Sequence, residues 1–241
     1  MSFEWKKNVA HRFDDCANEY DRHSAIQEKI AQTLAADLPD IENPLVLEIG
    51  CGTGALTQRL LKCYPGGRFH ITDISAHMVD RARSRIGEQK NVRWSVMDGE
   101  SPAKDQHYDI IVSNMAFQWF GNPHGTFETL LGLLESGGVI FYTVPAPESF
   151  PEWRASLKEF SLDNGLLNFE SWPGVFREDE IVEHHQSTLH FLRNLKKGGM
   201  NTPRIGYKTL SRKDLLKTCR YADESFHGQV TWHILYGRIQ G

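Results

Sequence analysis

A glycine-rich turn after a short apolar run is the first feature of this sequence that could bind a ligand. Residues 48–54 read Glu-Ile-Gly-Cys-Gly-Thr-Gly and follow directly on the apolar residues 45–47. Glycines at such a turn let the backbone approach a bound molecule closely. Turns that bind dinucleotides usually follow the pattern G-x-G-x-x-G, whereas the spacing here is G-x-G-x-G. The carboxylate of Glu48 would repel a pyrophosphate but attract the ammonium group of an amino acid. The turn therefore favours S-adenosylmethionine over a dinucleotide.

Carboxylates also follow the next two apolar runs. Asp73 ends the second run, 21 residues beyond Gly52, where Rossmann-type folds place an acid that accepts hydrogen bonds from ribose hydroxyls. Asp98 follows the third run, where its carboxylate could accept a hydrogen bond from the adenine amino group. Ile74 and Met78 are expected to pack against the adenine ring. The residues expected to contact the cofactor on these grounds are Glu48, Gly50, Cys51, Gly52, Asp73, Ile74, Met78, Asp98, Gly99, Ser113 and Asn114.

The elements that must position these residues alternate between short apolar runs and helical stretches. This alternation indicates βαβ units around a parallel sheet. We therefore expect an α/β fold, with a Rossmann-like, mostly parallel sheet flanked by helices and ligands bound at the carboxyl ends of the strands. The expected strands are 45–49, 69–72, 92–97, 108–113 and 139–144, and the expected helices are 53–63, 75–86, capped by Ser75, and 126–134.

The length of 241 residues suits a single domain with a sizeable insertion. We expect an N-terminal helical lid at 1–44, a cofactor-binding core at 45–144, a helical insertion on the substrate side at 145–206, and a closing helix and strand at 207–241. Glycine and proline break the insertion into short helices. Only one closing strand, 229–238, is evident after the last helix, so the edge of the sheet stays undefined.

Several stretches resemble known methyltransferases. Residues 47–54, with Asp73 and Asp98, resemble the motifs of the class I S-adenosylmethionine-dependent methyltransferases. Within that class, the chain is similar to the malonyl-acyl-carrier-protein O-methyltransferases of biotin synthesis. The stretches that carry this narrower resemblance are 9–13 with Ala17, 20–21, Gln27, 113–119, 191–198 and 231–233. The more selective of them are 114–119 and 191–198.

The resemblance implies methyl transfer from S-adenosylmethionine to the free carboxylate of a malonyl thioester carried by acyl carrier protein. It also implies that Tyr20 and Gln27 lie over the methionine end of the cofactor, as part of the lid. Phe117 and Trp119 would line the substrate side. Simple packing is the alternative role for Tyr20 and for both of these aromatic residues.

The chemistry implied needs positioning more than proton transfer. A carboxylate is already ionised at neutral pH, so no general base is expected. Arginine offers the planar fork that binds a carboxylate at two points, and Arg193 is the candidate. A surface salt bridge explains Arg193 equally well. Tyr20 and Arg193 are thus the expected catalytic residues, acting by positioning the reactants.

Charge is distributed unevenly along the chain. The net charge is −4, yet residues 193–220 hold nine Lys or Arg and one acid, a net +8 that leaves −12 on the rest. The overall negative charge argues against nucleic acid as a partner. The basic segment, with Lys196, Lys197 and Lys213, fits a docking surface for an acidic carrier protein. A solvated helix face is the alternative.

The cysteines and the apolar runs indicate in which cellular compartment the protein is expected. The four cysteines show no metal-site spacing, so we expect free thiols, no metal and a reducing compartment. No signal peptide or run of ~20 apolar residues is evident, so we expect a cytoplasmic protein without a membrane segment. The main alternative function is methylation of a free small carboxylic acid. A nucleic-acid methyltransferase and a non-catalytic cofactor-binding protein fit the sequence less well.

Overall fold

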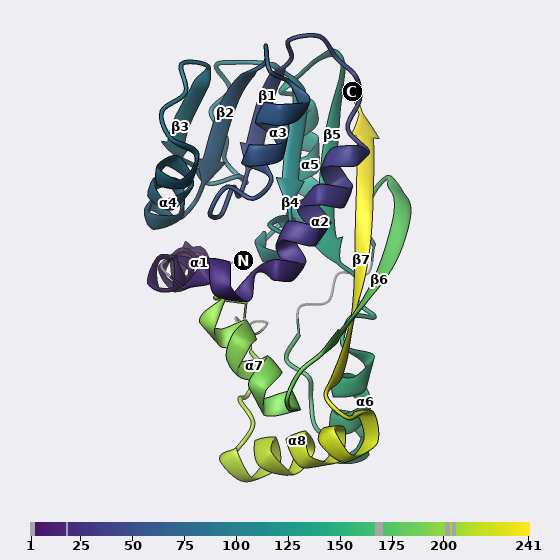
Figure 1. The fold of residues 1–241 in the computed structure, drawn as a ribbon. Helices are drawn as coiled ribbons and strands as arrows, with labels where there is room; N and C mark the ends of the chain where they lie inside the picture. Colours follow the sequence, from purple (N-terminus) through teal and green to yellow (C-terminus); the bar gives the residue numbers. More distant parts are fainter. Residues whose placement is uncertain (1–2, 18, 167–170, 201–202, 204–205) are drawn as a thin grey trace.

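The structure, a computed structural model, describes residues 3–17, 19–166, 171–200, 203 and 206–241. Within these residues, seven strands form one sheet in the order β3-β2-β1-β4-β5-β7-β6 (Figure 1). The first five strands are parallel to one another, and β7 pairs antiparallel with both β5 and β6. The strands are β1 Leu45–Ile49, β2 Arg68–Asp73, β3 Val92–Val96, β4 Tyr108–Asn114, β5 Leu134–Pro145, β6 Val175–His184 and β7 Gln229–Gln240. The expected mostly parallel sheet is confirmed.

Helices cover both faces of this sheet and extend beyond its carboxyl edge. They are α1 Phe3–Cys16, α2 Ala25–Ala36, α3 Thr57–Cys63, α4 Ala76–Ile86, α5 Pro123–Leu131, α6 Pro151–Glu159, α7 Thr188–Lys197 and α8 Arg212–Phe226, with the short 3-10 turns η1 Tyr20–His23 and η2 Phe117–Trp119. Ser75 caps α4 as expected, because its hydroxyl accepts a hydrogen bond from the Met78 amide at 3.0 Å. The helix expected at 126–134 instead begins at Pro123, after the cap Asn122, and Leu134 already belongs to β5.

The core lies on both faces of the sheet. Ile110 and Val112 of β4 pack with Ile30 of α2 on one face, whereas Ile111 packs with Phe127 of α5 on the other. These side chains alternate because successive residues of a strand point to opposite faces. Continuous apolar strands are typical of parallel sheets covered by helices on both sides.

The insertion contains a strand that the sequence analysis did not predict. Residues Val175–His184 were expected to be helical, but they form β6, which pairs antiparallel with β7 along its length. The insertion thus holds the expected helices, α6 and α7, together with one strand that was not expected. The sheet closes with an antiparallel pair whose outer member precedes the last helix in the chain.

The segments far from the core strands gather at one end of the molecule. Figure 1 shows α1 beyond the ends of β1, β2 and β3, with α7 on its far side, and α6 and α8 at the far end of the long β6–β7 pair. Helices α6 and α7 both contact α8. No helix among the described residues is long and apolar enough to cross a membrane.

Candidate active site

A cleft lies at the carboxyl ends of the parallel strands, as the sequence predicted. The residues that follow four successive neighbouring strands line it, and they come together only through the sheet order. Of the expected cofactor residues, those that line this cleft are Tyr20, Gly50, Gly52, Asp73, Ile74, Met78, Asp98, Gly99 and Asn114. A small adjoining pocket is lined by Gln27, Glu48 and Cys51, together with Tyr20, Gly50, Gly52 and Asn114.

The backbone of the glycine-rich turn forms the floor of the cleft. Gly50 and Gly52 have φ values of +76° and +51°, a region that favours glycine. A Cβ added to Gly50 would collide with the side chain of Ala116, whereas one on Gly52 would lie 3.9 Å from the Tyr20 ring. The turn thus needs glycine at position 50 both for its conformation and for its close approach to the segment after β4.

Asp73 is held by the backbone around it. Its two carboxylate oxygens accept hydrogen bonds from the amides of Gly52 and Ser75, each at 2.9 Å. Burial raises the pKa of Asp73 to about 6 in spite of these bonds. The carboxylate is therefore oriented at the cleft before any ligand arrives, and its remaining lone pairs can accept further hydrogen bonds.

Glu48 is a buried carboxylate without a cationic partner among the described residues. Its side chain is 1% exposed and accepts a hydrogen bond from the Thr57 hydroxyl at 2.6 Å. Burial, and then the nearby charge of Asp73, raise the pKa of Glu48 to about 8. In the same small pocket, the buried Gln27 Oε1 atom has no hydrogen-bond partner. A buried acid whose hydrogen-bond partner is one hydroxyl and an amide oxygen without a partner, both lining one pocket, suit a ligand that presents an ammonium group.

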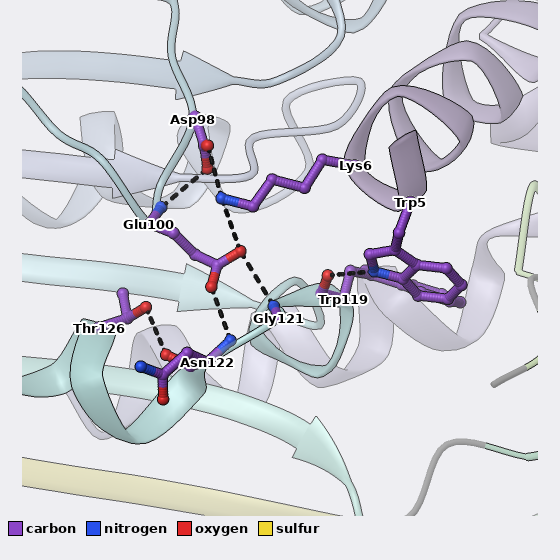
Figure 2. A network of polar contacts seen from close by, with 8 residues as sticks. All are labelled: Trp5, Lys6, Asp98, Glu100, Trp119, Gly121, Asn122 and Thr126. Atoms are coloured by element: carbon purple, nitrogen blue, oxygen red, sulfur yellow. Dashed lines mark hydrogen bonds and ion pairs between the residues drawn. The ribbon is translucent and has the colours of Figure 1, made fainter. Parts of the chain in front are cut away.

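A lysine from α1 reaches the acid that follows β3. The Lys6 Nζ atom lies 2.7 Å from Asp98 Oδ2 and 2.9 Å from Glu100 Oε2 (Figure 2). Glu100 in turn accepts hydrogen bonds from the amides of Gly121 and Asn122, at 3.0 and 2.7 Å. Asp98 thus links α1 to the cleft while keeping lone pairs for a ligand. Sequence reasoning missed Lys6, because its partners lie more than 90 residues away and no local pattern marks the pair.

The segment after α1 closes the methionine side of the expected site. Tyr20 lines the cleft, the small pocket and a second cavity. Burial raises the pKa of the Tyr20 hydroxyl, which is therefore protonated at neutral pH. The side-chain amide of Gln27 donates to Met200 Sδ at 2.8 Å, and the main-chain carbonyl of Gln27 accepts from Asn114 Nδ2 at 3.2 Å. The N-terminal segment, the end of β4 and the segment after α7 therefore meet at this point.

The second cavity has a volume of about 320 Å³ and shares Phe13, Tyr20, Met115 and Trp119 with the cleft. Its walls are largely apolar and include Phe150, Trp153, Leu192, Leu195 and Trp232. Met115 and Phe150 have φ values of +56° and +63°, which non-glycine residues rarely adopt and which cluster at functional sites. A cavity of this kind, beside a cleft with charged acceptors, can hold a second and less polar reactant.

Comparisons with known proteins agree with this geometry. Residues 47–140 match a family described as a methyltransferase domain. The chain is 36% identical to a malonyl-acyl-carrier-protein O-methyltransferase of Magnetococcus marinus, over 92% of this chain and 88% of that protein. The chain belongs to the malonyl-acyl-carrier-protein O-methyltransferase family. Another relative of that name, from Ilyobacter polytropus, is 30% identical over 96% of both chains.

This member of the O-methyltransferase family is also similar to a longer relative and to solved structures. A biotin biosynthesis bifunctional protein of Bordetella avium is 34% identical, and the match covers 96% of this chain but 52% of that protein. A solved putative methyltransferase from Bacillus halodurans superposes with a TM-score of 0.61 at 13% identity, covering 88% of this chain and 98% of that one. A Thiobacillus denitrificans methyltransferase, solved with S-adenosyl-L-homocysteine, superposes with a TM-score of 0.53 at 16% identity. The match covers 88% of this chain and 91% of that one. The solved structures establish the shared fold.

In this O-methyltransferase family member, three of the residues expected to contact the cofactor or the substrate lie away from the cavities. Ser113 is buried and donates to the Ile49 carbonyl at 2.9 Å, so it ties β4 to β1 beneath the cleft. Phe117 is 1% exposed and packs against Phe120, Phe127 and Tyr142 in the core. Trp119 does line both cavities.

Arg193, expected to bind the substrate carboxylate, is the third. It is exposed on α7 and is not among the residues that line either cavity. The neighbouring Leu192 and Leu195 face the cavity instead, because residues on one helix face recur every three or four positions. Lys196 also lines the cavity, whereas Lys197 and Lys213 lie exposed outside it.

Proposed function

We propose that this protein transfers the methyl group of S-adenosylmethionine to the free carboxylate of a malonyl thioester on acyl carrier protein, giving a methyl ester for biotin synthesis. The observation that carries the proposal is the small pocket lined by the buried acid Glu48 and by Gln27, whose Oε1 atom has no hydrogen-bond partner, beside a largely apolar cavity. The names of the family's relatives supply the substrate.

The residues of the cleft suit each part of the donor. Glu48 and the Gln27 side chain would bind the ammonium group, and Asp73 would accept hydrogen bonds from the ribose. Asp98 would accept from the adenine amino group, and Ile74 and Met78 would pack against the ring. Together with Gly50, Cys51, Gly52, Gly99 and Asn114, they form the proposed cofactor site. When bound there, S-adenosylmethionine supplies a methyl group that an oxygen nucleophile can attack.

The protein's own contribution to the reaction is positioning and exclusion of water. The carboxylate to be methylated is ionised near neutral pH and needs no base. Transfer requires its oxygen to be held close to the methyl carbon and in line with the departing sulfur. Tyr20, Met115 and Trp119 lie where cleft and cavity meet, so they would set that alignment. Residues 1–44 would act as the lid over this junction.

The basic segment supplies the proposed docking surface for the carrier protein. Lys196 and Lys197 end α7, Lys213 lies in the first turn of α8, and all three are exposed. Helices α7 and α8 contact each other, so these charges lie on neighbouring elements (Figure 1). Arg204, a further member of the segment, lies outside the described residues. Positive charge beside the cavity would steer an acidic protein toward it.

Transfer of a labelled methyl group to a panel of acceptors tests this function. The panel is malonyl-acyl carrier protein, acetyl-acyl carrier protein and free malonate. We expect labelling of the malonyl protein alone, because the acetyl form lacks the nucleophile and free malonate lacks the carrier. Labelling of malonate at the same efficiency would instead support the alternative, a methyltransferase for free carboxylic acids. No labelling of either malonyl acceptor would refute the proposed function.

A further inference from the structure

A half-buried arginine lies within the apolar cavity and has no role in the function described so far. Of the described residues that line the cavity, Arg154 and Lys196 carry positive charge. Lys196 is exposed in the last turn of α7, whereas Arg154 is half-buried on α6 and lines the cavity together with Phe150 and Trp153. An anion that enters the cavity and loses water would therefore meet Arg154 inside and Lys196 only at the solvent-exposed side.

Within the part of the chain that the structure describes, the Arg154 side chain forms a hydrogen bond through one of its three nitrogens. Its Nε atom donates to the Ser149 carbonyl at 2.8 Å. Ser149 is itself fixed to β7, because its hydroxyl donates to the His233 carbonyl at 2.8 Å and accepts from the His233 amide at 3.1 Å. Phe150, in the left-handed conformation, then turns the chain into α6. The guanidinium is thus anchored to the sheet while its two terminal nitrogens stay available.

The electrostatic setting of Arg154 also favours an incoming anion. Among the described residues, no carboxylate forms an ion pair with its guanidinium, and Glu148 acts on it only as a nearby charge. Burial lowers the pKa of the guanidinium below its usual value, as expected for a partly desolvated charge. A guanidinium remains charged at neutral pH all the same. A desolvated charge without a counterion gains more from pairing than an exposed one does.

We propose that Arg154 binds the carboxylate of the malonyl thioester and positions it for methyl transfer, an inference that rests on the proposed function. The planar fork of arginine matches a carboxylate, and each carboxylate oxygen keeps a second lone pair for attack on the methyl carbon. As the new C–O bond forms and the C–S bond breaks, the carboxylate loses its charge and the sulfonium becomes a neutral thioether. The neutral ester no longer pairs with Arg154, so the same contact that selects the substrate favours release of the product.

Replacement of Arg154 tests the proposal through binding and turnover. We expect Arg154→Gln to raise the KM for malonyl-acyl carrier protein roughly 10- to 100-fold, the loss typical of a charged hydrogen bond. The KM of Arg154→Lys should lie between those of Arg154→Gln and the wild type, because lysine keeps the positive charge but lacks the planar fork of arginine. Arg68→Gln, at the exposed first residue of β2, is the matched control and should leave KM unchanged. Affinity for S-adenosylhomocysteine should stay the same in all three.

Discrimination between two thioesters separates substrate binding from a structural role. The wild type should bind malonyl-acyl carrier protein more tightly than acetyl-acyl carrier protein, which lacks the carboxylate. In Arg154→Gln the two affinities should converge, with the acetyl affinity unchanged. Equal weakening of both ligands, or an unchanged malonyl preference, would overturn the assignment. Failure of the wild type to methylate any malonyl thioester would instead count against the proposed function itself.

Discussion

Glu48 is a residue that the free protein accommodates poorly and that a cationic ligand would stabilise. Its carboxylate is buried beside Asp73, and within the described residues its hydrogen-bond partner is the hydroxyl of Thr57. In the free protein it is therefore largely protonated at pH 7, since its pKa is about 8. Binding of an ammonium group favours the ionised form, so donor binding and loss of this proton are linked.

This linkage predicts the pH dependence of donor binding. Affinity for S-adenosylmethionine should rise as the pH increases from about 6.5 toward 8, because less work is then needed to ionise Glu48. Above the pKa of about 8 the gain should level off. Calorimetric titrations across this range would measure it, with Glu48→Gln as the variant that should bind weakly and lose the slope. An affinity independent of pH in the wild type would contradict the linkage.

The same shift predicts a stability effect of opposite sign. The pKa of Glu48 is higher in the folded protein than in the unfolded chain. The contribution of Glu48 to the free energy of unfolding is therefore fully present below about pH 4.5 and is lost as the pH rises through about 8. Glu48→Gln removes the buried charge and should raise the melting temperature at pH 8.5 by roughly 3 °C or more. The control Glu178→Gln, an exposed residue of β6, should change nothing. A melting temperature lowered by Glu48→Gln would refute this account of the site.

At the residue scale, local patterns predicted the cleft but not the cavity. The glycine turn, Asp73 and Asp98 each follow a strand, and strand ends meet at one edge of a parallel sheet. Whether Arg193 or Arg154 lines the cavity depends instead on which faces of α6 and α7 are directed toward it. That orientation follows from packing against distant elements, which the local sequence does not encode.

Among the elements, α1 is tied to the cleft by the ion pairs of Lys6 with Asp98 and Glu100. These contacts hold the proposed lid against the residues that would bind adenine (Figure 2). Opening of the lid must break them.

Weakening this tie should speed release of the bound cofactor. We expect Lys6→Gln to raise the dissociation rate of S-adenosylhomocysteine roughly 3- to 5-fold, in keeping with a partly exposed ion pair. Added salt should accelerate release from the wild type but not from the variant. Stopped-flow measurements would check both, with the exposed Lys29→Gln on α2 as control. A release rate unaffected by Lys6→Gln would show that α1 does not gate the cleft.

Strand β6 was not predicted because its sequence lacks the usual pattern of a strand. Residues 177–180 read Arg-Glu-Asp-Glu, which hides the alternation of a half-buried strand. In the structure β6 is the outermost strand, and charged side chains are a common means of keeping such an edge from pairing with other chains. Strands β1, β4 and β5 lacked this ambiguity, because burial on both faces made residues 45–47, 110–112 and 139–142 continuously apolar.

Over the whole molecule, the separation of charge between residues 193–220 and the remaining chain is the feature most relevant to a protein partner. Net +8 on the basic segment against −12 elsewhere makes the molecule strongly asymmetric. Exposed charges act over about one Debye length, ~8 Å at physiological salt, so their effect on association is local and sensitive to ionic strength.

Charge reversal on this surface should affect the carrier protein selectively. We expect the triple change Lys196→Glu, Lys197→Glu and Lys213→Glu to lower kcat/KM for malonyl-acyl carrier protein roughly 10-fold or more at low salt. Turnover of malonyl-pantetheine, which lacks the acidic protein, should change little. Reversal of the exposed Lys62, Lys90 and Lys104 makes the same change in net charge elsewhere and serves as control. An equal decrease of kcat/KM for malonyl-acyl carrier protein in both triple variants would exclude a localised docking surface.

A crystal structure of the protein with S-adenosylhomocysteine would show whether the cleft is the cofactor site. We expect the ligand's ammonium group within ion-pair distance of Glu48, its ribose hydroxyls on Asp73, and its sulfur directed toward the cavity that Tyr20 and Trp119 share with the cleft. A ligand bound elsewhere, or bound in the cleft with its ammonium group away from Glu48, would contradict this expectation.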